Sequence, residues 1–198
     1  MNEVLKQKIK RILVLLIYIC SIVIMSFIPD LGFIRYNYLT ISLVSIIVIL
    51  AAINNGWVYG TLCGLVFGIC SFFVANDYDM NPIDDIFMNV FVAVIPRVFL
   101  GLSSAICYQW IIKIFKKRWI SAMISSIISL ASMVLIIYLL ACVLEKNVLI
   151  GIYDETNLVY LFFQYVQYAT LIETSIITIF VGLLTAVMEY LFNKNNYL

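Results

Sequence analysis

The stretch GWVYGTLCGLVFG, from Gly56 to Gly68, contains four of the chain's eight glycines, at a strict spacing of four residues. Residues four apart lie on one face of a helix, and glycine there lets the backbone of a neighbouring helix approach closely. Small residues at this spacing are common where helices pack within a bilayer. We therefore expect Gly56, Gly60, Gly64 and Gly68 to be the helix-packing positions of a membrane helix.

The composition of the whole chain supports a membrane environment. Hydrophobic residues make up 65% of the 198 residues and charged residues 12%, whereas soluble domains average about 25% charged residues. We expect an all-α membrane protein whose residues 1–198 form a single integral membrane domain. The chain contains no histidine, which excludes any mechanism that uses imidazole as a base, metal ligand or proton relay.

Apolar runs bounded by charged or turn residues predict six transmembrane helices. Their expected ranges are Ile12–Ile28, Leu39–Ile53, Trp57–Ala75, Pro96–Phe115, Trp119–Leu144 and Tyr168–Phe192.

The distribution of basic residues predicts the orientation. Nine of the 12 lysines and arginines fall on one side if the amino terminus is inside, and cytoplasmic loops are enriched in such residues. We therefore expect a multi-pass protein of the bacterial cell membrane with both termini cytoplasmic. These nine residues are Lys6, Lys8, Lys10, Arg11, Lys113, Lys116, Lys117, Arg118 and Lys194.

The reactive residues do not form a catalytic pattern. The five cysteines lie in apolar stretches without a C-x-x-C spacing, so we expect small buried hydrophobic groups and neither a metal site nor a cofactor. Paired acids, or a nucleophile beside a base, are also missing from the sequence pattern. We expect no enzyme, no catalytic residues and no nucleic-acid partner.

The most informative polar residue is Arg97, which follows Pro96 in an apolar run. Proline suits the first turn of a helix, so we expect a helix over Pro96–Phe115 and a separate apolar segment over Ile83–Ile95. Arg97 would then lie at the outer amino-terminal turn, where free backbone N–H groups and the guanidinium favour a carboxylate or phosphate.

Two interpretations of Arg97 stay open at the sequence level. Glu173 lies near the outer end of the last expected span and is an obvious ion-pair partner, although snorkelling to the headgroups is an alternative. An ionisable residue within a span is equally a candidate binding residue. Gly101 and Ser104, which follow on the same face, leave room either for a ligand or for a close helix neighbour.

Other outer segments contain candidate ligand contacts. Gln164 and Gln167 lie among the aromatic residues of Tyr153–Leu171. That segment is typical of an interfacial aromatic belt, but its amides could also hydrogen-bond a small polar ligand. Arg35, in the turn before the second expected span, lies at the same level. Together these outer segments could form a lid.

An ordered series of motifs resembles a known family. FIPDLGFIRYNYLT, the glycine-rich stretch, an N-P step at Asn81 and AVIPRVFLGLSSAICY follow one another over about half of the chain. This series is similar to the substrate-binding S components of energy-coupling factor (ECF) vitamin transporters, in particular the pantothenate and riboflavin groups. The resemblance implies a six-helix membrane fold that binds one vitamin near its outer side.

The resemblance also implies partners and a mechanism. S components assemble with a transmembrane T component and two cytoplasmic ATPases, and topple in the membrane to deliver the vitamin inward. The chain has no G-x-x-x-x-G-K-[ST] loop for ATP phosphates, so the energy would come from those partners.

The leading hypothesis from the sequence is a subunit that binds a small carboxylate vitamin, first of all pantothenate, through Arg97. Its expected binding residues are Arg97, Asn81, Gln164, Gln167, Glu173 and Arg35. Riboflavin or folate, held by the outer aromatic residues, is an alternative. A membrane scaffold similar to the small rod-shape morphogenesis proteins, without a ligand site, is a second alternative.

Overall fold

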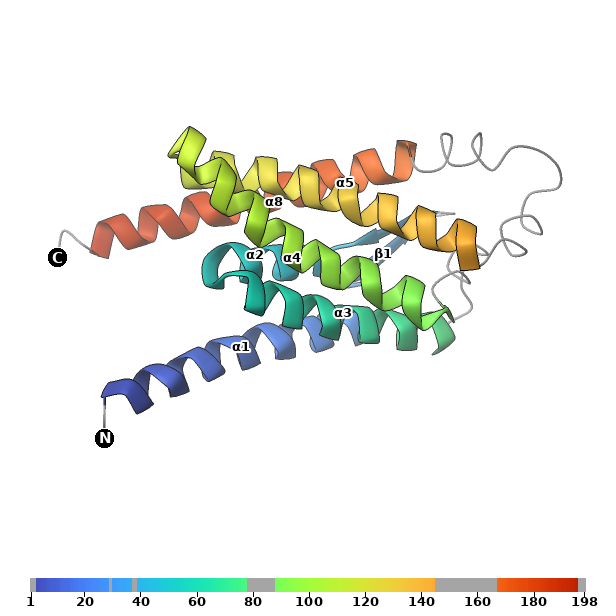
Figure 1. Ribbon diagram of the computed structural model, residues 1–198, viewed down its shortest axis with the longest axis horizontal. Coiled ribbons are helices and arrows are strands. Elements are labelled where there is room, and N and C mark those ends of the chain that lie inside the picture. The colour runs from blue at the N-terminus through green and yellow to red at the C-terminus, as the bar shows by residue number, and fades with distance from the viewer. Residues whose placement is uncertain (1–2, 29, 37–38, 78–87, 145–166, 196–198) are drawn as a thin grey trace.

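The computed structural model describes residues 3–28, 30–36, 39–77, 88–144 and 167–195, which form a bundle of helices with one β-hairpin (Figure 1). Side chains at a few positions at the ends of these ranges are not part of the description. The elements follow in the order α1 (Glu3–Phe27), β1 (Phe33–Tyr36), β2 (Leu39–Ser42), α2 (Val44–Asn55), α3 (Trp57–Asp77), α4 (Val90–Phe115), α5 (Arg118–Leu144) and α8 (Gln167–Asn195).

Five helices of the described chain are long and apolar enough to cross a membrane. They are α1, α3, α4, α5 and α8, and with them the chain is a multi-pass membrane protein. The prediction of a sixth span over Leu39–Ile53 is not confirmed. Its first residues form strand β2, and the remainder forms α2, whose 12 residues extend only about 18 Å.

The hairpin explains why the apolar run at Leu39 is not helical. Strands β1 and β2 pair antiparallel, with Phe33 opposite Ser42 and Tyr36 opposite Leu39. Both strands are rich in aromatic and β-branched residues, which favour extended backbone. Periodicity alone does not separate such a short apolar strand from a helix.

Helices α3 and α4 form the centre of the bundle. Helix α3 packs against α1, α2 and α4, and α4 packs in turn against α5. Helix α8 closes the bundle through contacts with α5, α2 and β2 (Figure 1). The short helix α2 is thus surrounded by longer helices, and seven of its 12 residues are buried.

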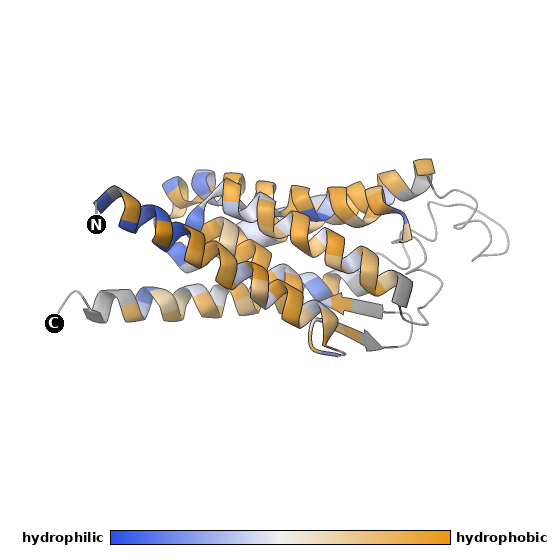
Figure 2. Ribbon diagram, turned by 90° about the horizontal axis from the view of Figure 1, so that it is seen from below, coloured by the Kyte–Doolittle hydropathy of each residue, from blue (hydrophilic) through white to orange (hydrophobic). Residues whose placement is uncertain are grey.

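Large hydrophobic side chains are exposed along the long helices, as expected in a bilayer, and these helices are mostly orange in Figure 2. Helix α1 shows this most clearly, since Ile12, Leu16 and Ile17 are each about half exposed or more. The expectation that every cysteine is buried is wrong for Cys20, which is exposed on α1, and for Cys107, which is only partly buried. Cys63 and Cys70 are buried.

Three glycines of α3 lie directly against the backbone of α4. A Cβ atom added to Gly64 would collide with the Arg97 carbonyl, and one added to Gly60 would collide with the carbonyl of Gly101. At Gly68 an added Cβ would come within 2.7 Å of Val94 Cα. The two helix backbones therefore approach as closely as small residues permit.

Gly56 does not share this face, which corrects the expectation of four equivalent packing glycines. A Cβ added there would meet nothing within 4 Å, and Gly56 has a φ of +91°. Its backbone N–H donates to Ala52 O at the end of α2 (3.0 Å). Gly56 is needed for the turn between α2 and α3, because positive φ is costly for residues with a side chain.

Both termini lie at the same end of the bundle, opposite the hairpin (Figure 1). The junction of α4 and α5, where Lys116 adopts a left-handed conformation (φ 56°), lies at this end as well. We name this the basic end, because it gathers the lysines and arginines that begin α1 and flank the junction (Figure 2). The opposite end is the hairpin end.

Candidate binding site at the hairpin end

Arg97 is buried within α4 with only 5% of its surface exposed. Its Nη1 donates to the carbonyl oxygens of Val92 (3.0 Å) and Ala93 (2.9 Å), in the preceding turn of the same helix. The guanidinium is therefore held toward the hairpin end.

The helix does not begin at Pro96 as expected. Helix α4 starts at Val90, and Asn89 caps it by accepting a hydrogen bond from the Phe91 N–H (3.0 Å). The Pro96 nitrogen has no hydrogen to donate to Val92 O, its usual helical acceptor. Arg97 Nη1 occupies that carbonyl instead, so side-chain chemistry keeps the proline inside the helix. Arg97 is consequently not at a helix amino terminus.

Aromatic rings lie against the guanidinium. Arg97 Cζ is 5.5 Å from the centroid of the Phe67 ring, which is a cation–π distance. Phe67 in turn stacks on Phe33 of the hairpin, with centroids 6.2 Å apart and an interplanar angle of 30°. The aromatic pair connects the hairpin to the central helices α3 and α4.

Glu173 provides the second connection to the hairpin. Its Oε1 accepts a hydrogen bond from the Ser42 backbone N–H at the end of β2 (3.0 Å). The Arg97 guanidinium also interacts electrostatically with the Glu173 carboxylate. Because Ser42 pairs with Phe33 across the hairpin, one rung of the hairpin contacts both the aromatic pair and the acidic residue.

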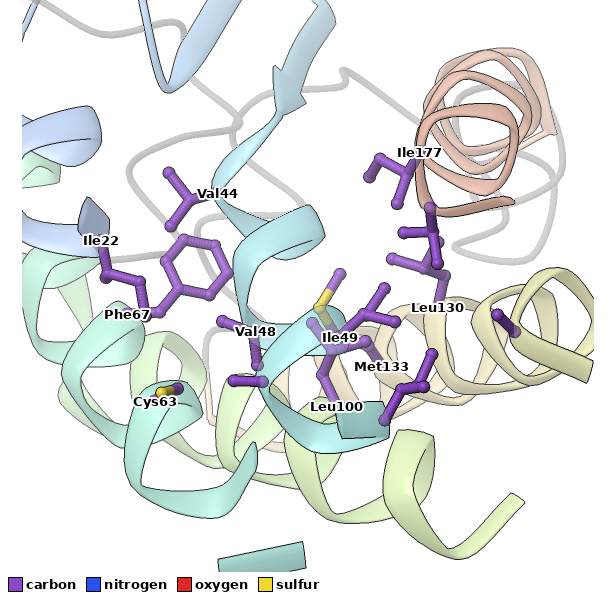
Figure 3. Packing of buried hydrophobic residues seen from close by; sticks show 14 of the residues in the cluster. Ile22, Val44, Val48, Ile49, Cys63, Phe67, Leu100, Leu130, Met133 and Ile177 are labelled. Carbon is purple, nitrogen blue, oxygen red and sulfur yellow. The ribbon is translucent and has the colours of Figure 1, made fainter. Parts of the chain in front are cut away.

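An apolar cluster lies next to these polar groups, on the side toward the basic end. In Figure 3 the side chains of α2, α4, α5 and α8 converge in one buried cluster, to which Ile49, Leu100, Leu130, Met133 and Ile177 belong. Arg97 precedes Leu100 by three residues and Glu173 precedes Ile177 by four, so each lies about one helical turn nearer the hairpin end. We name Arg97, Glu173, Phe67 and Ser42 the polar layer.

On the side of Arg97 toward the basic end, neighbouring helices fill the space. Gly101 lies against the backbone of Gly60, and Ser104 Oγ hydrogen-bonds Ser129 Oγ of α5 (2.9 Å). The structure thus decides between the two interpretations that the sequence left open for these positions. They serve close helix packing.

The structure brings together two of the predicted binding residues, Arg97 and Glu173. Asn81 and Gln164 lie outside the described residues, as does most of the aromatic segment. Arg35 lies on β1 opposite Thr40, and Gln167 is the first residue of α8. The backbones of both are therefore at the hairpin end.

The sequence did not indicate that Phe67 and Ser42 belong to the polar layer, or that Phe33 contacts it. Phe67 is one apolar residue among many in α3, and its contact with Arg97 depends on the packing of two helices. Ser42 contributes a backbone N–H, for which the sequence has no signal. The hairpin pattern of aromatic and β-branched residues before α2 was the one available indication.

Comparisons with known proteins identify the family. A family model described as the ECF transporter, substrate-specific component, matches residues 12–193 of this chain. The chain belongs to this family. The resemblance inferred from the motifs is therefore confirmed at the level of the S component family, and the chain is a substrate-specific subunit of an ECF transporter.

A solved structure shows the same fold. It is described as "Structure and mechanism of the S component of a bacterial ECF transporter" and superimposes with a TM-score of 0.63. The match covers 93% of this chain and 98% of that chain at 17% sequence identity. A search of curated proteins found no match. The S component fold is thus established, whereas its ligand in this chain is a separate question.

Proposed function

We propose that this S component binds a small carboxylate vitamin at the hairpin end, with pantothenate as the first candidate and Arg97 as the partner of the carboxylate. The observation that supports this most strongly is the burial of Arg97 in a helix able to cross a membrane, where it interacts electrostatically with Glu173. Ionisable residues at membrane depth are energetically costly and usually functional.

The chemistry of the polar layer suits a carboxylate. Guanidinium groups bind carboxylates through paired N–H donors, and such charge-assisted bonds are stronger in a site shielded from water. Two carbonyls and the Phe67 ring hold the guanidinium in place. A substrate carboxylate would pair with the Arg97 guanidinium, which now interacts electrostatically with Glu173.

Delivery of the substrate requires partners in this proposal. The full sequence contains no G-x-x-x-x-G-K-[ST] loop, so ATP hydrolysis would come from two cytoplasmic ATPases acting through a transmembrane T component. The bacterial plasma membrane, with the basic end inside, is the proposed location.

A second candidate is a vitamin with a large ring system, such as riboflavin or folate. The stack of Phe33 on Phe67 at the polar layer favours it, because aromatic faces bind planar rings. The family match favours either vitamin over the scaffold alternative.

Arg97→Gln tests the proposal. Loss of the charge should weaken pantothenate binding by about 2–5 kcal/mol. Isothermal titration of the purified protein with pantothenate, riboflavin and folate would measure this. Arg118→Gln, an exposed arginine at the basic end, is the matched control and should bind like wild type.

Two results would decide against the carboxylate assignment. One is unchanged pantothenate affinity in an Arg97→Gln protein that remains folded by thermal melting. The other is wild-type binding of riboflavin or folate without binding of pantothenate, which would favour the second candidate.

A further inference from the structure

Two buried hydroxyls at the junction of β2 and α2 have no hydrogen-bond partner among the described residues. They belong to Ser42 and Ser45, and Ser45 is 0% exposed. Leaving a buried hydroxyl unsatisfied is unfavourable, so native structures usually provide a partner. Two such groups only three residues apart call for a functional explanation.

Two other buried serines of the bundle show how this cost can be avoided, although the hydroxyls of Ser26 and Thr178 also lack a partner among the described residues. Ser104 donates to Leu100 O (2.6 Å) and Ser126 donates to Ala122 O (2.7 Å), each one turn earlier in its own helix. Ser45 lacks this option, because it is the second residue of α2 and the residue four positions earlier is in strand β2. The short helix places its hydroxyl where backbone cannot satisfy it.

The position of these hydroxyls connects them to the proposed binding site. Ser45 precedes Ile49 by four residues and therefore lies on the same face of α2. Figure 3 shows Ile49 near Met133 and Leu100. Ser42 is fixed at the polar layer by the hydrogen bond from its N–H to Glu173. Leu43, the N-cap of α2, provides no side-chain cap.

We propose that the Ser42 and Ser45 hydroxyls form a second subsite, which hydrogen-bonds a hydroxyl group of the substrate while Arg97 binds its carboxylate. The inference rests on the proposed function and narrows it: the substrate is a hydroxylated carboxylate. A hydroxyl both donates and accepts, and so matches the two serine hydroxyls. A site that hydrogen-bonds a substrate hydroxyl also rejects analogues that lack it.

The test compares two ligands that differ only at this point. Pantothenate and its analogue with both hydroxyls replaced by hydrogen are titrated into wild type, Ser42→Ala and Ser45→Ala. Wild type should prefer pantothenate by about tenfold or more, and each substitution should reduce pantothenate affinity about three- to tenfold. Affinity for the analogue should not change.

The control is Ser126→Ala, which removes an equally buried hydroxyl that is satisfied within α5. It should retain the wild-type preference. Thermal melting without ligand adds a second measurement: Ser45→Ala should be as stable as wild type, because its hydroxyl has no protein partner to lose.

The outcomes distinguish failure of the hydroxyl subsite from failure of the proposed carboxylate site at Arg97. If wild type binds both ligands equally, or if Ser45→Ala keeps the full preference, the subsite is refuted while the role of Arg97 stands. If wild type binds neither ligand, the pantothenate-like carboxylate site itself is refuted, and the subsite with it.

Discussion

Arg97 and Glu173 lie in two helices that are apolar enough to cross a membrane, and each is held by backbone groups. Arg97 donates to two carbonyls of its own helix, and Glu173 accepts from the Ser42 N–H. Such bonds reduce the cost of charge at membrane depth. The two opposite charges also interact, so in the proposed site the contribution of each residue to binding depends on the other.

At the residue scale, Glu173→Gln should raise the affinity for a carboxylate ligand. The amide oxygen can still accept from Ser42, but the negative charge that competes for Arg97 is gone. We expect about tenfold tighter binding of pantothenate, equivalent to ~1.4 kcal/mol. The ligand-free protein should melt at a lower temperature, because a buried charge then lacks compensation.

Titration calorimetry and thermal melting of the Glu173→Gln protein measure the two effects. The control is Glu189→Gln, nearer the basic end of the same helix. It should change neither the pantothenate affinity nor the melting temperature. Weaker binding by the Glu173→Gln protein would show that the carboxylate assists the ligand rather than competing with it.

At the scale of elements, the contact between α3 and α4 positions Arg97 and with it the proposed binding site. Gly64 lies against the backbone of Arg97 itself. A Cβ atom added to Gly64 would also come within 3.1 Å of Val98 Cα. Backbone atoms cannot rotate away as a side chain does. The separation of the two helices is therefore set by glycine, and the position of the guanidinium depends on it.

Gly64→Ala should consequently destabilise the fold and weaken binding together. We expect a loss of about 1–3 kcal/mol in the free energy of unfolding, as for other overpacked interiors. Thermal melting and pantothenate titration check both effects. Thr61→Ala, in the same helix with its hydroxyl bonded to Trp57 O (2.6 Å), is the control. Equal stability of Gly64→Ala and wild type would contradict the packing role.

At the scale of the whole molecule, the basic residues and the polar layer lie at opposite ends of the bundle. The termini and the α4–α5 junction lie at the basic end, and the polar layer lies at the hairpin end (Figures 1 and 2). Lysine and arginine near membrane helices favour the cytoplasmic side. The polar layer should therefore face outward, where substrate arrives.

Labelling of single introduced cysteines tests this orientation. A membrane-impermeant maleimide applied to intact cells should react with Ile34→Cys in the exposed part of the hairpin, and not with Lys116→Cys at the basic end. Inverted vesicles should give the opposite pattern. The unsubstituted protein controls for native cysteines such as Cys20. Labelling of Lys116→Cys in intact cells would reverse the proposed topology.

The sequence by itself determined the membrane class, the approximate ranges of five long helices and the S component family. It also indicated that Arg97 and Glu173 belong to one region. These properties are encoded locally, because the length of an apolar run, the sign of flanking residues and a series of motifs are readable along the chain.

The tertiary structure decided the hairpin, the short α2, the start of α4 and the surroundings of Arg97. Leu39–Ser42 is a strand because β1 supplies its hydrogen-bond partners. Pro96 is tolerated inside α4 because the Arg97 side chain donates to the Val92 carbonyl, to which proline cannot donate. Phe67 and Ser42 meet Arg97 and Glu173 only through packing between elements distant in sequence. Such contacts have no periodic or compositional signal, since each depends on how closely separate helices and strands approach one another.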